Sequence, residues 1–403
     1  MFQLALRNVF RHRLRTALTL AAIMLGVVGL ILSGGFIEDV LLQLREATIH
    51  SQLGHLQVYR NGYYEHGAVA PYGYLIEKPD AVVTSLEKLP LVEEVTERLN
   101  FAAVLNNGHA DIPVLGQGLE PQREAKLGAS IAITAGRPLS GEGRYEILLG
   151  EGVAAASKLK PGDHATLLTN TSEGALNNLE FEIVGIFRSF SKDYDARAVW
   201  IPLGAAQELL DVKAVNAIVL LLKDTRQTDQ VAALLRRGLD GREYEMKTWN
   251  ELADFYGKTV ALYRRQFAVL QVIILVTVLL SVANSVNMSI FERTGELGTL
   301  MALGSRRKNI FRLVVAENLL LGLIGGCGGV LLGILLAWGI SVVGIPMPPP
   351  PNSNSGYTAL IRVVPAVVAG AFSIGFLATV VASLLPARRV VRLPVIEALR
   401  QNQ

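Results

Sequence analysis

The polar residues that could do chemistry inside an apolar setting lie mainly in the second half of this sequence. Asn284 and Asn287 interrupt one uncharged run, and Glu317 is an acid near the start of another. Between these runs lies Glu292–Leu303, a short segment with charges of both signs, followed by the basic cluster 306–308. In a membrane, side chains of these types form hydrogen bonds and ion pairs between helices. These residues therefore predict contacts between membrane helices and docking to another protein.

Catalytic motifs are absent from the sequence. It has no phosphate-binding loop of the form G-x-x-x-x-G-K-[ST], no G-x-S-x-G elbow, no H-E-x-x-H and no paired C-x-x-C. The six histidines are scattered, and we interpret the pair His109 and Asp111 as exposed polar residues of a hairpin. Asp193 and Asp195 fall in a polar stretch that we interpret as a solvated loop. We expect a chain that is not an enzyme and that has no catalytic, metal or cofactor site.

The elements that must position the polar residues are apolar runs. Hydrophobic residues make up 51% of the 403 residues, and runs of roughly 18 or more apolar residues are typical of transmembrane helices. The predicted spans are residues 16–37, 267–291, 313–344 and 363–386. The first run is longer than the apolar part of a signal peptide, and no small-residue cleavage site follows it, so we interpret it as a span.

The placement of basic residues predicts the orientation of these spans. Residues 1–15 hold four arginines and no acid, the connection 292–312 holds five basic residues, and the tail from 388 holds four. The loop 345–362 holds one, Arg362. The positive-inside rule then puts both termini and the 292–312 connection in the cytoplasm. With the single cysteine, Cys327, inside a span, we expect a multi-pass protein of the bacterial inner membrane whose large domain is periplasmic.

The segment between the first two spans predicts a large outer domain. Residues 53–247 alternate strand and helix patterns, and Asn106-Asn107-Gly108 is a hairpin signal. Helical patterns over 38–52 and 248–266 predict two stalks that carry this domain. The fold class is an α-helical membrane protein with four transmembrane helices plus a large extracytoplasmic α+β domain, a porter-like base with a β-rich insertion, between helices 1 and 2. The remaining predicted parts are an amphipathic cytoplasmic helix over 1–15, a cytoplasmic coupling helix over 292–312, a proline-rich periplasmic loop over 345–362 and a cytoplasmic tail over 387–403.

The polar and small residues inside the spans have two interpretations each. For Asn284 and Asn287 we favour helix or dimer packing over a transport pathway. Glycines at small-xxx-small spacing in the third span allow two helices to approach closely. We predict that Gly322, Gly326 and Gly329 pack in this way. Glu317 lies about one turn inside that span. A structural ion pair with Arg312 or Arg293 and a mechanistic role both remain open.

Two motifs resemble a known family. The second span runs into E-R-T-G-E-L-G-T-L-M-A-L-G-S (Glu292–Ser305), and the chain approaches its end with L-P-A-R-R-V-V-R-L-P-V-I-E-A-L-R (Leu385–Arg400). Together with the basic patch and the glycine-rich span, they are similar to the FtsX-like permease family of ABC transporters. In layout the chain resembles the MacB-type exporters and the Lol-type lipoprotein-releasing permeases. The motifs cover about 267–400, and the likeness of the outer domain is one of layout.

The resemblance implies a dimer of permease subunits, homo- or heteromeric, working with two copies of a separate ATPase that binds ATP and Mg. The helix around Glu292–Leu303 would seat in a groove of that ATPase, and family members move the outer domain through the stalks, a scheme called mechanotransmission. Apolar residues would enter the groove while charged residues pair at its rim. The predicted coupling residues are Glu292, Arg293, Glu296, Leu297, Leu300, Met301 and Leu303.

The substrate is left open between alternatives. The resemblance and the size of the outer domain favour extraction or export of a lipoprotein or lipid-like cargo, with a periplasmic carrier or adaptor as a further partner. Drug or peptide efflux with an adaptor, and a non-transporting permease that controls a cell-wall hydrolase, are the alternatives. A membrane-anchored enzyme or receptor is a different class, disfavoured by the missing catalytic motifs and by the number of spans. Beyond membrane lipids and these proteins we expect no nucleic-acid partner.

Overall fold

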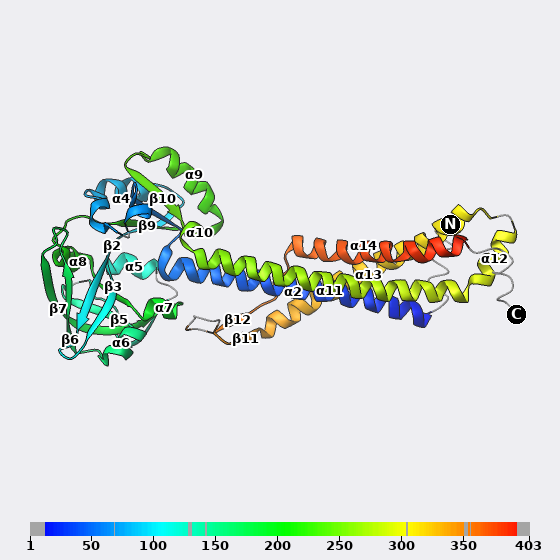
Figure 1. The fold of residues 1–403 in the computed structure, drawn as a ribbon, viewed down its shortest axis with the longest axis horizontal. Coiled ribbons are helices and arrows are strands. Elements are labelled where there is room, and N and C mark those ends of the chain that lie inside the picture. The colour runs from blue at the N-terminus through cyan, green and yellow to red at the C-terminus, as the bar shows by residue number, and fades with distance from the viewer. Residues whose placement is uncertain are drawn as a thin grey trace. The chain divides into compact units, whose positions relative to one another are not determined.

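The computed structural model describes residues 13–67, 69–127, 131–141, 143–303, 305–349, 354 and 356–392. The chain divides into two compact units (Figure 1). The membrane unit consists of 1–42, 259–347 and 358–403, and the outer domain unit consists of 43–258 together with 348–357. The predicted helix over 1–15 and the end of the tail fall mostly outside the described residues. Each unit is treated by itself below.

Long apolar helices build the membrane unit. In the described residues, four helices are long and apolar enough to cross a membrane. They are α2 (Arg13–Thr48), α11 (Asp254–Glu292), α13 (Arg307–Val343) and α14 (Pro365–Arg392). The helix α2 continues past its apolar run to Thr48, and α11 starts at Asp254, ahead of its apolar run, so each overlaps a predicted stalk in part. The predicted fold class, four such helices with a mixed domain between the first two, is confirmed.

Glycines set the packing of the membrane unit. A Cβ added at Gly329 of α13 would lie 2.8 Å from Val27 of α2, and one at Gly325 would lie 3.0 Å from Ile23. On the other side of α13, a Cβ at Gly326 would lie 2.8 Å from the Phe372 ring of α14, and Gly322 faces Thr379. Because small residues let helix backbones approach, α13 packs against both α2 and α14.

The outer domain is built on one sheet. In the described residues the sheet has ten strands in the order β10-β1-β9-β2-β3-β8-β5-β7-β4, with β6 pairing both β2 and β7. The base strands are β10 (Tyr244–Thr248), β1 (Leu56–Arg60), β9 (Ala217–Leu222) and β2 (Val92–Asn106). The other strands are β3 (Asp111–Leu119), β4 (Ala132–Gly136), β5 (Glu146–Gly150), β6 (His164–Asn170), β7 (Leu176–Arg188) and β8 (Ala198–Pro202).

Two hydrophobic cores correspond to a base and an insertion. The base core lies under α4 (Pro79–Glu87) and α9 (Thr228–Gly238), and it is made of aliphatic residues such as Leu56 and Val95. The second core lies under α6 (Glu151–Ser157) and α8 (Leu203–Leu210) and includes Phe181. The long strand β2 contributes to both cores, so base and insertion share one continuous sheet.

Smaller elements complete the chain. In the outer domain these are α3 (Tyr63–His66), a 3-10 turn at Pro71–Tyr74, α5 (Pro121–Leu127), α7 (Lys192–Asp195), a 3-10 turn at Thr225–Gln227 and α10 (Trp249–Leu252). A π-helical turn at Ile49–Leu53 joins α2 to the outer domain. Between α11 and α13 lies α12 (Thr294–Ala302), and β11 (Ile345–Met347) pairs with β12 (Tyr357–Ala359).

Candidate functional site

The helix α12 is set off from α11 by a single residue. The helix α11 ends at Glu292, and Arg293 has φ −106° and ψ 7°, outside the α-helical region. The Thr294 hydroxyl donates to the Ile290 carbonyl at 2.8 Å, and the Arg293 N–H donates to the same carbonyl at 3.1 Å. These bonds hold the bend. A helix this short is marginal by itself, so α12 depends on its packing against α11 and α13.

One side of α12 is open and the other is packed. Leu300 and Leu303 are 40% and 79% exposed, and Glu296 is also exposed. Met301, predicted to enter a partner's groove, is half-buried and packs against Ile310 of α13. The side chain of Leu297 lies outside what the structure describes, and Glu292 is exposed. The exposed leucines and acids leave α12 with an amphipathic open face.

The side chain of Arg293 turns inward. Its Nη1 donates to Glu317 Oε2 of α13 at 2.9 Å, and its Nε lies 3.5 Å from Glu296 Oε2 of α12. The Arg293 and Glu317 side chains are 13% and 10% exposed. Of the two partners left open for Glu317, the structure selects Arg293, and Arg312 is exposed. Removing one member of a buried pair typically costs about 3–5 kcal/mol because the other charge loses its partner.

A second buried charge, which the sequence did not indicate, lies at the other end of the membrane unit. Asp39 of α2 is fully buried, and its carboxylate accepts the Leu360 N–H at 2.8 Å and the Arg362 Nε–H at 2.8 Å. The Arg362 N–H also donates to the Gly35 carbonyl at 3.2 Å. Beside them, the Ser341 hydroxyl of α13 accepts the Ile361 N–H at 3.0 Å. The start of the α14 segment is therefore fastened to both α2 and α13.

The amides of α11 lie on different parts of its surface. Asn284 is exposed and Asn287 is half-buried. Asn284 falls in line with exposed apolar residues at three- and four-residue spacing, and this α11 stripe comprises Val269, Ile273, Val276, Leu280, Asn284, Met288 and Phe291. The opposite side of α11 packs through Val278, Val282 and Val286. Exposed apolar residues with an amide among them are typical of a helix face that meets lipid or another protein.

The polar residues of the outer domain have local structural roles. The turn between β2 and β3 is closed by Asn106, which donates to Asp111 Oδ1 at 2.6 Å, and His109 is exposed beside it. Asp195 is buried, and its carboxylate accepts the Ser189 N–H at 3.0 Å and an Asn354 amide N–H. The expected solvated loop is thus wrong for Asp195, which is 2% exposed and in contact with Asn354. Among the described residues, no group of three or more His, Cys, Asp or Glu could hold a metal.

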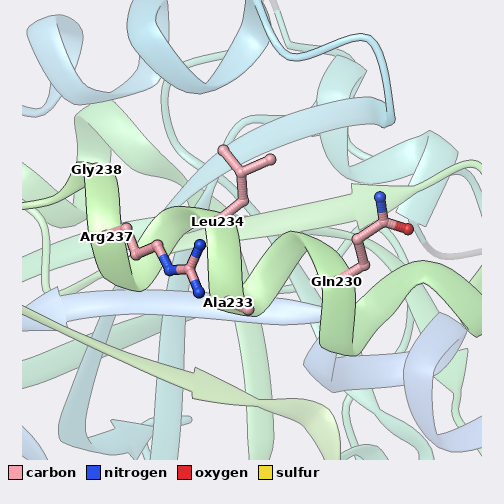
Figure 2. A pocket seen from close by; sticks show the side chains of 5 residues that line it. All are labelled: Gln230, Ala233, Leu234, Arg237 and Gly238. Carbon is pink, nitrogen blue, oxygen red and sulfur yellow. The ribbon is translucent and has the colours of Figure 1, made fainter.

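A hollow on α9 offers little to a ligand. Figure 2 shows it lined by side chains of one helix, with Leu234 between Arg237 and Gln230 along that helix. Its volume is about 520 Å³, and its remaining lining residues are Ala233 and Gly238. Binding pockets are usually concave, with walls from several elements and a few converging polar groups. A hollow along one face of one helix does not have that form, so the candidate functional site is α12 with its Arg293 junction.

Two family models match successive parts of the chain. The MacB-like periplasmic core domain matches residues 16–237, and the FtsX-like permease C-terminal domain matches residues 268–395. The first covers α2 and most of the outer domain. The second covers α11 to α14, including α12 and its junction.

Curated relatives carry both transport and uncharacterised names. The chain is 24% identical to the pyoverdine export ATP-binding/permease protein PvdT of Pseudomonas entomophila, over 98% of this chain and 59% of that protein. It is 24% identical to the macrolide export ATP-binding/permease protein MacB of Shewanella sp. strain ANA-3, over 99% of this chain and 60% of that protein. It is also 24% identical to an uncharacterized ABC transporter permease of Methanocaldococcus jannaschii, over 69% of this chain and 68% of that protein.

The comparison with solved structures finds likenesses over about half of the chain. The match to the periplasmic region of MacB from Actinobacillus actinomycetemcomitans covers 51% of this chain and 94% of the solved chain, with 13% identity and a TM-score of 0.37. The chain spans about three fifths of the length of the PvdT and MacB relatives, which are named as ATP-binding/permease proteins. Because the first family model alone covers more than half of the residues, membership is shown: the chain belongs to the MacB/FtsX-like family of ABC transporter permeases.

Proposed function

We propose that this chain couples ATP hydrolysis by an ABC ATPase to the movement of an envelope substrate. The observation that carries the proposal is the open face of α12, a short helix between two membrane helices with exposed Leu300 and Leu303 beside exposed Glu296. Apolar residues ringed by charge suit a groove with a polar rim. In this proposal α12 is the coupling helix, the ATPase contributes ATP and Mg, and the chain hydrolyses nothing itself.

The orientation follows from the same assignment. A cytoplasmic ATPase requires α12 in the cytoplasm, which agrees with the basic residues that flank it, among them Arg306, Arg307 and Lys308. Both termini are then cytoplasmic and the outer domain is periplasmic, in a bacterial inner membrane. Cysteine accessibility in intact cells tests this part: a cysteine at Leu234 must react with an impermeant maleimide, and one at Lys308 must not.

The coupling assignment is tested by introducing charge on the open face. The double variant Leu300→Asp plus Leu303→Asp should reduce co-purification of the ATPase at least tenfold, because each carboxylate would have to be desolvated in an apolar groove. Leu234→Asp, an equally exposed leucine of the outer domain, is the matched control and should leave co-purification unchanged. Retention of the ATPase by the double variant would overturn the assignment of α12.

The α11 stripe supports a dimer of permease subunits. An amide exposed to lipid is unfavourable, and a second subunit packed on the stripe would give Asn284 a partner across the interface. In a background carrying Cys327→Ala, Asn284→Cys should then form a disulfide-linked dimer under mild oxidation. The control Val381→Cys lies on α14, outside the α11 stripe, where the valine is 51% exposed. Equal cross-linking at both positions would contradict an interface on this stripe.

Two cargo classes compete. The outer domain and its two stalks favour a lipidated cargo handed to a periplasmic carrier, whereas the relatives named for macrolide and pyoverdine export favour a small molecule passed to an adaptor. Proteoliposomes with the chain and its ATPase can be offered a fluorescent triacylated peptide and, separately, a macrolide. ATP-dependent release of the peptide alone would support the lipidated class, and movement of the macrolide alone would support efflux. ATP hydrolysis without movement of either would favour the regulatory alternative.

A further inference from the structure

Arg293 joins three helices of the membrane unit. Its backbone forms the bend between α11 and α12, its Nη1 donates to Glu317 of α13 at 2.9 Å, and its Nε lies 3.5 Å from Glu296 of α12. Glu317 is ten residues into α13, which starts at Arg307. The pair thus fixes the N-terminal end of α12 to the interior of the next membrane helix, and not only to the helix that precedes it.

The surroundings make this connection stiff. The Arg293 and Glu317 side chains are both nearly enclosed, and Thr294 beside them is buried with its hydroxyl on the Ile290 carbonyl. Met301 packs with Ile310 toward the other end of α12. Separating a buried ion pair is costly because each charge stays desolvated while it loses the attraction of the other. A displacement of α12 therefore either carries α13 with it or breaks the pair, and carrying α13 is the less costly course.

The helix α13 is well placed to pass on such a displacement. It contacts α2 through Gly325, Gly329 and Gly333, and α14 through Gly322 and Gly326. Close contacts between helix backbones transmit displacement because packed interiors deform little. By contrast α11, which leads directly to the returning stalk, exposes a long stripe of its surface. Movement of α12 therefore has two routes through the membrane unit.

We infer that Glu317 is a positioning residue that makes α13 move with α12, so that motion entering at α12 reaches α2 and α14 as well as the stalk of α11. This inference rests on the proposed function, since it requires an ATPase to move α12. It assigns the acid a mechanical role in transmission. The guanidinium of Arg293 connects α12 to Glu317, and Glu296 keeps this guanidinium oriented when α12 is displaced.

The test reads the two routes separately in the full chain, in nanodiscs with its co-purified ATPase. In a Cys327→Ala background, one cysteine replaces Val342 near the far end of α13 and, in a second protein, one replaces Leu262 in α11; both native residues are exposed. The rate of maleimide labelling is compared without nucleotide and after trapping with ATP and vanadate. Without further substitution we expect at least a threefold change in rate at both positions.

Glu317→Gln should abolish the nucleotide-dependent change at position 342, keep it at position 262, and leave co-purification of the ATPase unchanged. Glu317→Asp, which keeps the charge, should restore at least half of the change at 342. Arg312→Gln, an exposed charge on the same helix, is the matched control and should behave as the parent.

Each remaining outcome counts against a specific proposal. A response at 342 that survives Glu317→Gln would overturn the inference, and so would a parent that responds at 262 and not at 342, with the proposed function intact in both cases. No response at either position in the parent, with the ATPase bound and trapped, would overturn the inference together with coupling through α12.

Discussion

The two units bury charge in different places. In the outer domain, the Arg98–Glu124 pair is enclosed where Arg98 of β2 meets Glu124 of α5, and both side chains are about 4–5% exposed. In the membrane unit, the Arg293–Glu317 and Asp39–Arg362 pairs lie near the ends of the apolar runs, and the middle is packed by glycines and aliphatic residues. A charge at mid-membrane is costly, whereas near the helix ends it can approach headgroups and water.

The apolar contacts of the two units also differ. The outer domain core contains large enclosed side chains, with the Phe187 ring stacked on Trp200 at 4.4 Å between centroids. Folding in water is driven by removing such surface from solvent, which contributes roughly 25 cal/mol per Å². Lipid supplies no comparable drive between helices, so close approach at small residues takes its place. The same kind of substitution can therefore have opposite effects on stability in the two units, and each unit can be tested separately.

The largest effect is expected where a charge is most enclosed. Glu124→Ala should lower the free energy of unfolding of the outer domain by about 3–5 kcal/mol, because the buried Arg98 keeps its charge and loses the carboxylate that neutralises it. Hydrogen exchange of the β2 and β3 amides in the full chain measures this loss. The control Glu120→Gln removes a partly exposed carboxylate that lies 3.3 Å from Arg123, and it should change stability by less than about 1 kcal/mol.

The double variant Arg98→Met plus Glu124→Leu sharpens this result. Replacing both charges by apolar side chains of similar volume is often neutral, so we expect it to recover most of the stability lost in Glu124→Ala. If the double variant is as unstable as the single one, the enclosed charge is not the source of the loss, and the contrast between the units is weakened.

The pair at the outer end of the membrane unit should respond unequally to loss of either member. Arg362→Gln leaves the fully buried Asp39 carboxylate with the Leu360 N–H but without its cation, and we expect a loss of about 2–4 kcal/mol. Asp39→Asn leaves Arg362 near 45% exposed and able to reach water, so its loss should be smaller, about 1–2 kcal/mol. Thermal unfolding of the full chain in detergent measures both. Equal losses would show that exposure does not decide the cost at this site.

Strong local signals predicted the spans and one hairpin. The apolar runs became α2, α11, α13 and α14, and the Asn106–Gly108 signal became the turn between β2 and β3, where Asn106 pairs with Asp111. The turn between β6 and β7 lies near Thr171–Ala175, and Asn177 is already in β7. Its amide donates to the Glu208 and Leu209 carbonyls of α8, contacts that no local pattern indicates.

The pairings of the candidate site could be predicted only in part. An acid one turn inside a span indicated an ion pair, but the choice of Arg293 over Arg312 depends on how α12 folds back, and so does the inward position of Met301. Asp39–Arg362 joins residues more than three hundred positions apart, and Glu124 lies on α5, which no periodicity indicated. Partners so distant in sequence leave no signal in a single chain because the tertiary fold alone brings them together.

The pH dependence of the outer domain should follow a histidine at its junction with the stalk. His55 Nδ1 accepts the Leu222 N–H at 3.1 Å and its Nε2 contacts the Thr225 hydroxyl at 3.0 Å, so the ring is held neutral. Burial is the main cause that lowers the pKa of His55 from 6.5 to about 4, with the nearby His50 adding to it. The unfolded chain therefore binds this proton near pH 6.5, whereas the folded chain binds it only near pH 4.

Stability should then be fully present above pH 6.5 and should fall between pH 6.5 and 4, with a slope of up to about 1.4 kcal/mol per pH unit. His55→Asn keeps an acceptor for the Leu222 N–H but cannot titrate, and it should remove this part of the slope. Exchange of the β9 amides as a function of pH provides the measurement. A slope that is the same in both proteins would assign the pH dependence to other groups.

The smallest effects test whether glycine packing in the membrane unit has the sign that the comparison requires. A methyl group at Gly329 would lie 2.8 Å from Val27 Cβ and 3.1 Å from the Met24 backbone, which cannot move aside like a flexible side chain. Gly329→Ala should therefore destabilise the unit by about 1–2 kcal/mol. At Gly339, on the same helix, nothing lies within 4 Å, so Gly339→Ala should stabilise it by about 0.5–1 kcal/mol through helix propensity. Thermal unfolding in detergent compares the two, and two changes of the same sign would mean that close approach does not hold α13 against α2.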